Sequence, residues 1–280
     1  MSWKIVADSG CDFRQLTQLT SDLQFESVPL TIQVENTVYT DDANLDIDQM
    51  MQQMEASKQA SKSACPSPDD YLNAYKGADK IFVLTITGAL SGSQNAAQVA
   101  KGLLLEENPH VQIHVIDTLS AGGEIDLLVL KLQELIQSGL SFEEVKDAIR
   151  DYQTKTKLLF VLASVQNLVK NGRLSKAIGA VIGLLNVRMV GEASAEGKLE
   201  LLKKARGYKK SVSSSIDAML EAGYKGGRIV IAHRNNEKFC QDFSEKIRAH
   251  FPQAIIDAIP TSGLCSFYAE EAGLLMGYEI

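Results

Sequence analysis

The sequence is poor in the residues that build most metal, redox and disulfide sites. Its 280 residues include four cysteines and four histidines. The cysteines are scattered without a C-x-x-C pair, and no histidine is spaced with another histidine or a carboxylate as metal ligands are. We therefore expect reduced thiols, a cytoplasmic location, and neither a metal nor a cofactor.

A surplus of basic residues and a long hydrophobic run are also missing. The formal net charge is -7, with no stripe of Lys and Arg against that balance. Nucleic-acid binding depends on clustered cations that neutralise phosphates, so we expect no nucleic-acid partner. The longest apolar stretch, residues 177–190, is broken by glycines, Asn186 and Arg188. It is too short and too polar to span a bilayer, so we expect no stable membrane insertion.

What the sequence does contain is a regular alternation between strand-like and helix-like periodicity. This alternation is typical of an α/β protein with a mostly parallel sheet covered on both faces. In the first half we expect strands at 4–7, 28–34, 80–86 and 111–116, and helices at 47–55, 95–107 and 124–137.

The pattern changes after a helix expected at 142–154 and a strand at 158–163. Strands at 187–193 and 198–204, joined by Ser-Ala-Glu-Gly, predict a hairpin. Further strands are expected at 227–232 and 254–259, and helices at 212–221 and 237–251. A hairpin mixed with helices favours an α+β fold. We therefore expect an N-terminal α/β domain over residues 1–155 and a C-terminal α+β domain over residues 156–280.

Residues 85–97 form the first segment in which a ligand could bind. A strand ends there in a small, hydroxyl-rich turn that contains Ser91, Gly92 and Ser93, and a helix follows. Helix N-termini bind anions such as carboxylate or phosphate. The alternative is that one of these serines only caps its own helix.

Two further segments carry polar groups next to helix ends. Pro68 predicts the first turn of a helix, and the extended loop before it contains Ser63. Arg173 follows Gly172, a glycine placed as a helix C-cap. Its guanidinium could bind a carboxylate with two hydrogen bonds, or it could form a surface ion pair.

Together these segments resemble the DegV family, and the likeness runs in order over nearly the whole chain. The matching motifs are Asp8-Ser9, Val28-Pro-Leu, Tyr39-Thr-Asp41, Ser63-Ala-Cys-Pro-Ser-Pro68, Leu90-Ser-Gly-Ser93, Val115-Ile-Asp117, Gly122-Gly123, Asn171-Gly-Arg-Leu-Ser175 and Lys204-Ala-Arg-Gly207. The resemblance implies a two-domain fold that holds one long-chain fatty acid in a tunnel between the domains. It implies that Ser63 and Ser91 hold the carboxylate, with Ser93 and Arg173 in support. It also implies a carrier that is not an enzyme and that presents the acid to a separate ATP-dependent fatty acid kinase.

The chain departs from the family pattern in two places. The family's Thr-Ser-Gln reads Ser63-Ala64-Cys65, which keeps the first hydroxyl and loses the next two polar groups. The C-terminal His-x-Gly-Pro-Gly segment is replaced by residues 265–273, with Tyr268 at the register of the histidine. A tyrosine hydroxyl can form hydrogen bonds but has no positive charge at neutral pH. Tyr268 is therefore the fifth candidate for ligand binding.

An acyl chain needs apolar walls, for which we expect residues 178–185 and 264–267. Two other functions remain open. The anion-binding turn would also suit an enzyme that acts on a small phosphorylated or hydroxylated substrate, although no phosphate loop or histidine–carboxylate pair supports it. A regulatory module that senses lipid and signals to a partner would use the same site.

Overall fold

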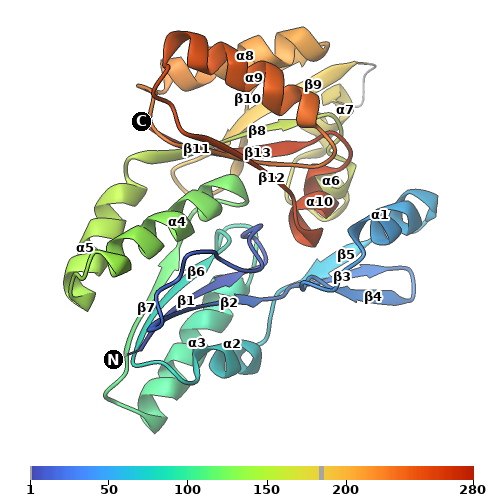
Figure 1. Cartoon of the computed structure of the whole chain (residues 1–280). Coiled ribbons are helices and arrows are strands. Elements are labelled where there is room, and N and C mark those ends of the chain that lie inside the picture. Colours follow the sequence, from blue (N-terminus) through green and yellow to red (C-terminus); the bar gives the residue numbers. More distant parts are fainter. Residues whose placement is uncertain (1, 183–185) are drawn as a thin grey trace.

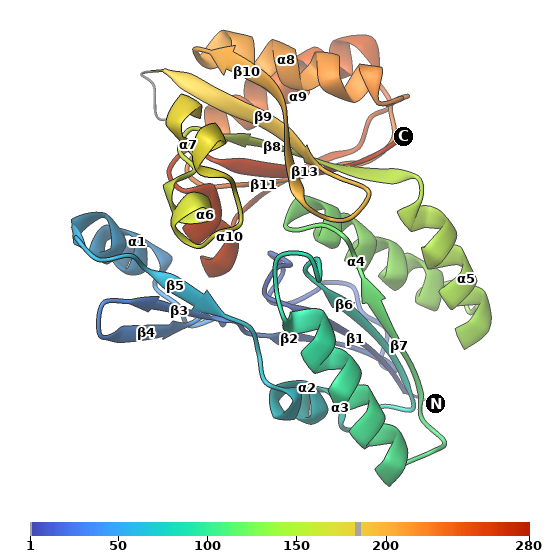
Figure 2. The same cartoon turned by 180° about the vertical axis from the view of Figure 1, so that it is seen from behind.

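The computed structural model describes residues 2–182 and 186–280, which form three β-sheets surrounded by helices (Figure 1). The first sheet is parallel, with the strand order β2-β1-β6-β7. Its strands are β1 (Trp3–Asp8), β2 (Leu23–Val28), β6 (Lys80–Thr85) and β7 (Gln112–Asp117). Helices α2 (Pro68–Tyr75) and α3 (Ser93–Glu107) cover one face, and α4 (Gly123–Gln137) and α5 (Phe142–Gln153) cover the other (Figure 2). This arrangement confirms the expected α/β fold.

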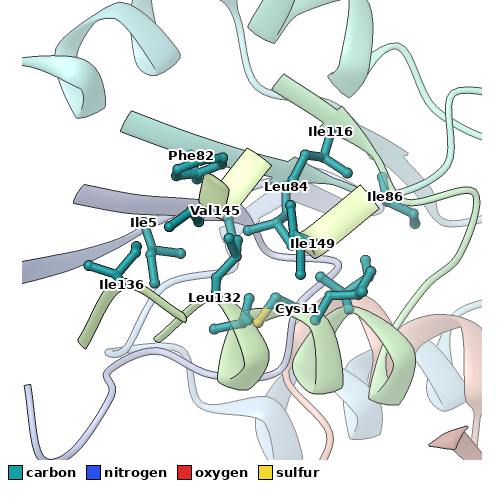
Figure 3. Close-up of a cluster of buried hydrophobic side chains, with 14 of the residues drawn as sticks. Ile5, Cys11, Phe82, Leu84, Ile86, Ile116, Leu132, Ile136, Val145 and Ile149 are labelled. Carbon is teal, nitrogen blue, oxygen red and sulfur yellow. The ribbon is translucent and has the colours of Figure 1, made fainter. Parts of the chain in front are cut away.

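Successive residues of the central strands enter two different cores. Phe82 and Leu84 face α4 and α5, where they pack with Val145 (Figure 3). Val83 lies on the opposite face and packs with Tyr71 of α2. Because both faces of the sheet are buried, the strand reads as a continuous apolar run and not as an alternating one.

The second sheet is small and antiparallel, and it extends to one side of the molecule with helix α1 (Ile47–Ala56) (Figure 1). Its strands are β3 (Thr31–Val34), β4 (Thr37–Thr40) and β5 (Lys62–Ala64), in the order β4-β3-β5. The single strand expected at 28–34 was therefore wrong. Pro29, which has no N–H donor, and Leu30 separate β2 from β3, so the two strands join different sheets.

The third sheet has six strands in the order β10-β9-β8-β13-β11-β12, and all its neighbours are antiparallel except β11 and β12. The strands are β8 (Thr156–Leu162), β9 (Val187–Ala193), β10 (Leu199–Arg206), β11 (Ile229–His233), β12 (Ile256–Pro260) and β13 (Leu274–Glu279). Helices α8 (Tyr208–Glu221) and α9 (Glu237–His250) cover its outer face. Helices α6 (Gln166–Lys170), α7 (Lys176–Ile182) and α10 (Gly263–Ala269) lie on the other side (Figure 2).

Helix α4 lies between the parallel sheet and the six-stranded sheet (Figures 1 and 2). Its first residue approaches β13 so closely that a Cβ atom on Gly277 would lie 2.3 Å from the carbonyl oxygen of Gly123. Every strand of the first two sheets precedes residue 155, and every strand of the third follows it. This distribution agrees with two domains over 1–155 and 156–280, but the position of the boundary remains a prediction. Within the described ranges, none of the helices is both long enough and apolar enough to form a membrane span.

Candidate ligand-binding site

A cavity of about 350 Å³ lies between the parallel sheet and the six-stranded sheet, a volume typical of small-molecule sites. Both halves of the chain contribute apolar side chains to it: Leu30, Ile86 and Ala121 from the first half, and Phe160, Leu162 and Leu275 from the second. The cavity is at the carboxyl end of the parallel sheet, where Leu30 follows β2, Ile86 follows β6 and Ala121 follows β7. Ligands commonly bind at this position in parallel α/β sheets.

The polar side chains of the cavity gather into one polar group: Tyr268 contacts Ser63 and Arg173, and Arg173 binds the turn that carries Ser91. Ser63, at the middle of β5, hydrogen-bonds to Tyr268 of α10 with 2.7 Å between the two hydroxyl oxygens. The Arg173 guanidinium carbon lies 5.9 Å from the centre of the Tyr268 ring. The Arg173 Nε–H donates to the carbonyl oxygen of Leu90, the residue before Ser91 (3.3 Å). Ser63, Ser91, Arg173 and Tyr268 all line the cavity. The structure thus brings together four of the five candidate residues.

The position of Ser91 is compatible with both of the roles that the sequence left open. Its hydroxyl oxygen accepts a hydrogen bond from the backbone N–H of Ser93 (3.2 Å), so it satisfies one free donor at the start of α3. The O–H hydrogen of Ser91 is not used in that bond, because the oxygen is the acceptor. The serine can therefore complete its own helix and still donate to a ligand.

Ser93 is placed differently from the other candidates. It is fully buried and is not part of the cavity wall. Its hydroxyl donates to Oδ2 of Asp8 (2.5 Å) and lies 2.6 Å from the Tyr71 hydroxyl. The expected support of a ligand carboxylate does not fit this position, because the side chain of the first helical residue points back into the core.

Asp8 fixes the turn that carries Ser91. Its carboxylate accepts hydrogen bonds from the backbone N–H groups of Ile86 (3.0 Å) and Gly10 (3.0 Å), as well as from Ser93. Burial raises the pKa of Asp8 to about 6, although these donors favour the charged form and lower it. Asp8 thus ties β1, the end of β6 and the start of α3 together directly behind the cavity.

Arg173 is half-buried, and its guanidinium donates hydrogen bonds to backbone carbonyl oxygens. Besides the bond to Leu90, Nη1 donates to the carbonyl oxygen of Asn171 (2.6 Å). In the described part of the chain, no carboxylate forms an ion pair with it. Of the two roles open for Arg173, the surface ion pair is therefore not observed, and the charged group is available at the cavity.

The expected apolar walls are correct in part. Leu264 and Cys265 line the cavity, but Phe267 is buried under the small sheet against Ile32 and Met50. Of the stretch 178–185, residues 183–185 lie outside the described residues, and Ile178 packs beside the cavity without lining it. Sequence reasoning missed the walls on β8 and β13. Positions 158–162 of β8 are all apolar and buried on both faces, so the sequence carried no signal for which face would line a cavity.

Among the described residues that line the cavity, none is a histidine, an aspartate or a glutamate. Burial raises the pKa of the Cys11 thiol well above its usual range, and the nearby Asp126 carboxylate raises it further. Such a thiol is a poor nucleophile. Among the residues that the structure describes, no three His, Cys, Asp or Glu side chains are grouped so as to hold a metal ion.

Comparison with known proteins identifies the family. The family model described as "Uncharacterised protein, DegV family" matches residues 2–275. A DegV domain-containing protein of Streptococcus gordonii is 68% identical over 280 residues, which is 100% of both chains. The crystal structure of the Streptococcus pneumoniae fatty acid kinase (Fak) B3 protein loaded with linoleic acid has 68% sequence identity, a TM-score of 0.99 and 100% coverage of both chains. A DegV family protein from Eubacterium eligens loaded with heptadecanoic acid has 37% identity, a TM-score of 0.95 and 99% coverage of each chain. This chain therefore belongs to the DegV family.

Proposed function

We propose that this protein binds one long-chain fatty acid, with the acyl tail in the cavity and the carboxylate at Ser63, Ser91, Arg173 and Tyr268. The observation that carries the proposal is the division of the cavity into apolar walls and one polar group. An amphiphile with a single charged end matches that division. A small phosphorylated substrate would leave most of the apolar wall without a partner.

The binding energetics of the apolar walls and of the polar residues both support a fatty acid as the ligand. Each buried methylene group contributes roughly 0.8 kcal/mol, so the tail can supply most of the affinity. A carboxylate that leaves water needs hydrogen-bond donors to offset its desolvation. Three hydroxyl groups and one guanidinium are available at the polar group. The related proteins from Streptococcus pneumoniae and Eubacterium eligens carry linoleic and heptadecanoic acid, which supports a fatty acid as the ligand.

We further propose that the protein is a carrier and that a separate ATP-dependent fatty acid kinase acts on the bound acid. The Streptococcus pneumoniae relative belongs by its description to a fatty acid kinase, and this supports the proposal. On this proposal, both proteins work in the cytoplasm. The protein supplies the binding site and the kinase supplies the chemistry. Incubated alone with ATP and palmitate, it should form neither ADP nor acyl phosphate, and turnover that copurifies with the protein would contradict the carrier role.

Binding itself is tested with delipidated protein and added palmitate or oleate. Calorimetric titration should saturate at about one fatty acid per chain. The methyl esters of the same acids should bind more weakly, because they lack the charge that the polar group satisfies. Absence of heat and of any thermal stabilisation by either acid would refute the proposal.

A further inference from the structure

Asp41, in the loop that follows β4, holds the beginning of helix α10. Its side chain is buried, and its two oxygens accept hydrogen bonds from the backbone N–H groups of Gly263 and Leu264, both at 2.8 Å. Oδ1 also accepts from Nη2 of Arg14 at 2.8 Å. One carboxylate from the first half of the chain thus satisfies two free donors of a helix from the second half.

The contact between Asp41 and α10 is close enough to require a glycine. A Cβ atom on Gly263 would lie 2.6 Å from Oδ1 of Asp41 and 2.4 Å from Cδ2 of Leu45. The preceding N–H group, of Ser262, donates to Oδ1 of Asp12 at 2.6 Å. Three successive backbone donors at this end of α10 therefore bond to carboxylates from the N-terminal half.

The other end of the same helix carries part of the polar group. Tyr268 lies five residues after Gly263 in a helix of seven residues, a span of about 8 Å at 1.5 Å per residue. Its hydroxyl meets Ser63 at 2.7 Å, and the neighbouring Phe267 carbonyl accepts from Nδ2 of Asn167 at 2.8 Å. A displacement at the start of so short a helix is carried to Tyr268.

We propose that Asp41 is a positioning residue for the head-group site. By fixing the start of α10, it places the Tyr268 hydroxyl beside Ser63 and so sets the preference for a free carboxylate over an uncharged head group. This inference rests on the proposed fatty-acid binding. Hydrogen bonds depend on distance and angle, whereas apolar contacts are not directional. A small shift of α10 therefore weakens carboxylate binding much more than tail binding.

The test compares the affinities of palmitate and methyl palmitate for delipidated wild type and Asp41→Asn. Asparagine keeps one acceptor oxygen but presents an NH₂ group where the second oxygen was, so one backbone donor loses its partner. We expect Asp41→Asn to lower palmitate affinity about tenfold, as for the loss of one charge-assisted hydrogen bond, and methyl palmitate affinity less than about twofold. Asp42→Asn is the matched control: it removes the same charge one residue later, where the carboxylate accepts a hydrogen bond from the N–H of Asn44 and none from α10. It should change neither affinity.

A double-mutant comparison separates positioning from general support of the fold. In a Tyr268→Phe background, Asp41→Asn should change the palmitate-to-ester ratio by less than about twofold, because the hydroxyl that Asp41 positions is gone. If Asp41→Asn does not fold, Gly263→Ala replaces it, since this change disturbs the same contact and keeps every charge. Equal weakening of both ligands, or an undiminished effect without the Tyr268 hydroxyl, would overturn the inference. Wild type that binds neither ligand would refute the proposed function itself, and the first titration reveals that before any variant is compared.

Discussion

The hydroxyls of Ser63 and Tyr268 lie 2.7 Å apart although 205 positions separate the two residues along the chain. Ser63 belongs to the small sheet of the N-terminal half, and Tyr268 belongs to a short helix of the C-terminal half. Their contact joins the two halves at the polar group of the cavity. A ligand head group bound there would contact residues of both halves. Substitutions in either half should therefore alter the affinity for the ligand.

Ser91→Ala should lower fatty-acid affinity more than it lowers stability. On the proposed function, the change removes a donor to the carboxylate, typically about 1.5–3 kcal/mol of binding free energy. It also removes the acceptor for the Ser93 N–H, which should cost about 1 kcal/mol of unfolding free energy. Calorimetric titration with palmitate and thermal unfolding without ligand measure the two quantities separately.

The neighbouring substitution Ser93→Ala provides the control, because it should lower stability more than it lowers fatty-acid affinity. It takes a donor from the buried Asp8 carboxylate and should cost about 1–3 kcal/mol of unfolding free energy. The free energy of palmitate binding should change less than it does for Ser91→Ala, because Ser93 does not line the cavity. A larger loss of affinity for Ser93→Ala than for Ser91→Ala would contradict the assignment of the head-group site.

Asp8 should make the protein less stable as the pH rises. Burial raises the pKa of Asp8 in the folded protein to about 6, above its ordinary value of 3.8. The folded state therefore binds the proton more tightly than the unfolded state does. The resulting stability is fully present below pH 3.8 and is lost as the pH rises through about 6.

Asp8→Asn isolates this contribution. Between pH 4 and pH 7 the wild type should lose up to about 3 kcal/mol of unfolding free energy relative to the variant. Urea unfolding of both proteins across this range gives the difference, in which the other carboxylates cancel. A difference that stays constant with pH, or a wild type that gains relative stability as the pH rises, would show that Asp8 remains charged throughout.

The cavity predicts how affinity depends on chain length. If the tail lies against apolar walls such as Phe160 and Leu162, each added methylene contributes roughly 0.8 kcal/mol, or about fourfold in affinity. Saturated acids of about ten to fourteen carbons should follow this slope until the cavity is full. Equal affinities across the series, measured by displacement of a fluorescent fatty acid, would place the tail outside the cavity.

The sequence predicted correctly those helices and strands that are determined by the pattern of their own residues. The strand at 187–193 and the helix at 124–137 match β9 and α4 within one residue, because each has a clear periodicity. Strand β5 was missed, since its three residues lie in a polar tract and pair only with β3. Helix α10 was also missed. Its N-cap residue, Ser262, makes no side-chain cap hydrogen bond, and the capping carboxylates come from the distant Asp12 and Asp41.

The candidate site was also predictable only in part from the sequence. Ser63, Ser91, Arg173 and Tyr268 line one cavity, and the resemblance to the DegV family had implied a shared site for them. Ser93 stands only two positions from Ser91, but it faces the core. Which of two neighbouring hydroxyls reaches a cavity depends on the start of α3 and on the partner Asp8, and neither is visible in the motif.

The most direct measurement of the central claim is native mass spectrometry of the protein as purified from a bacterial host, followed by solvent extraction. We predict one added mass per chain, identified in the extract as a long-chain fatty acid and absent after delipidation. A chain that carries no such mass, and that acquires none when palmitate or oleate is added, would contradict the account.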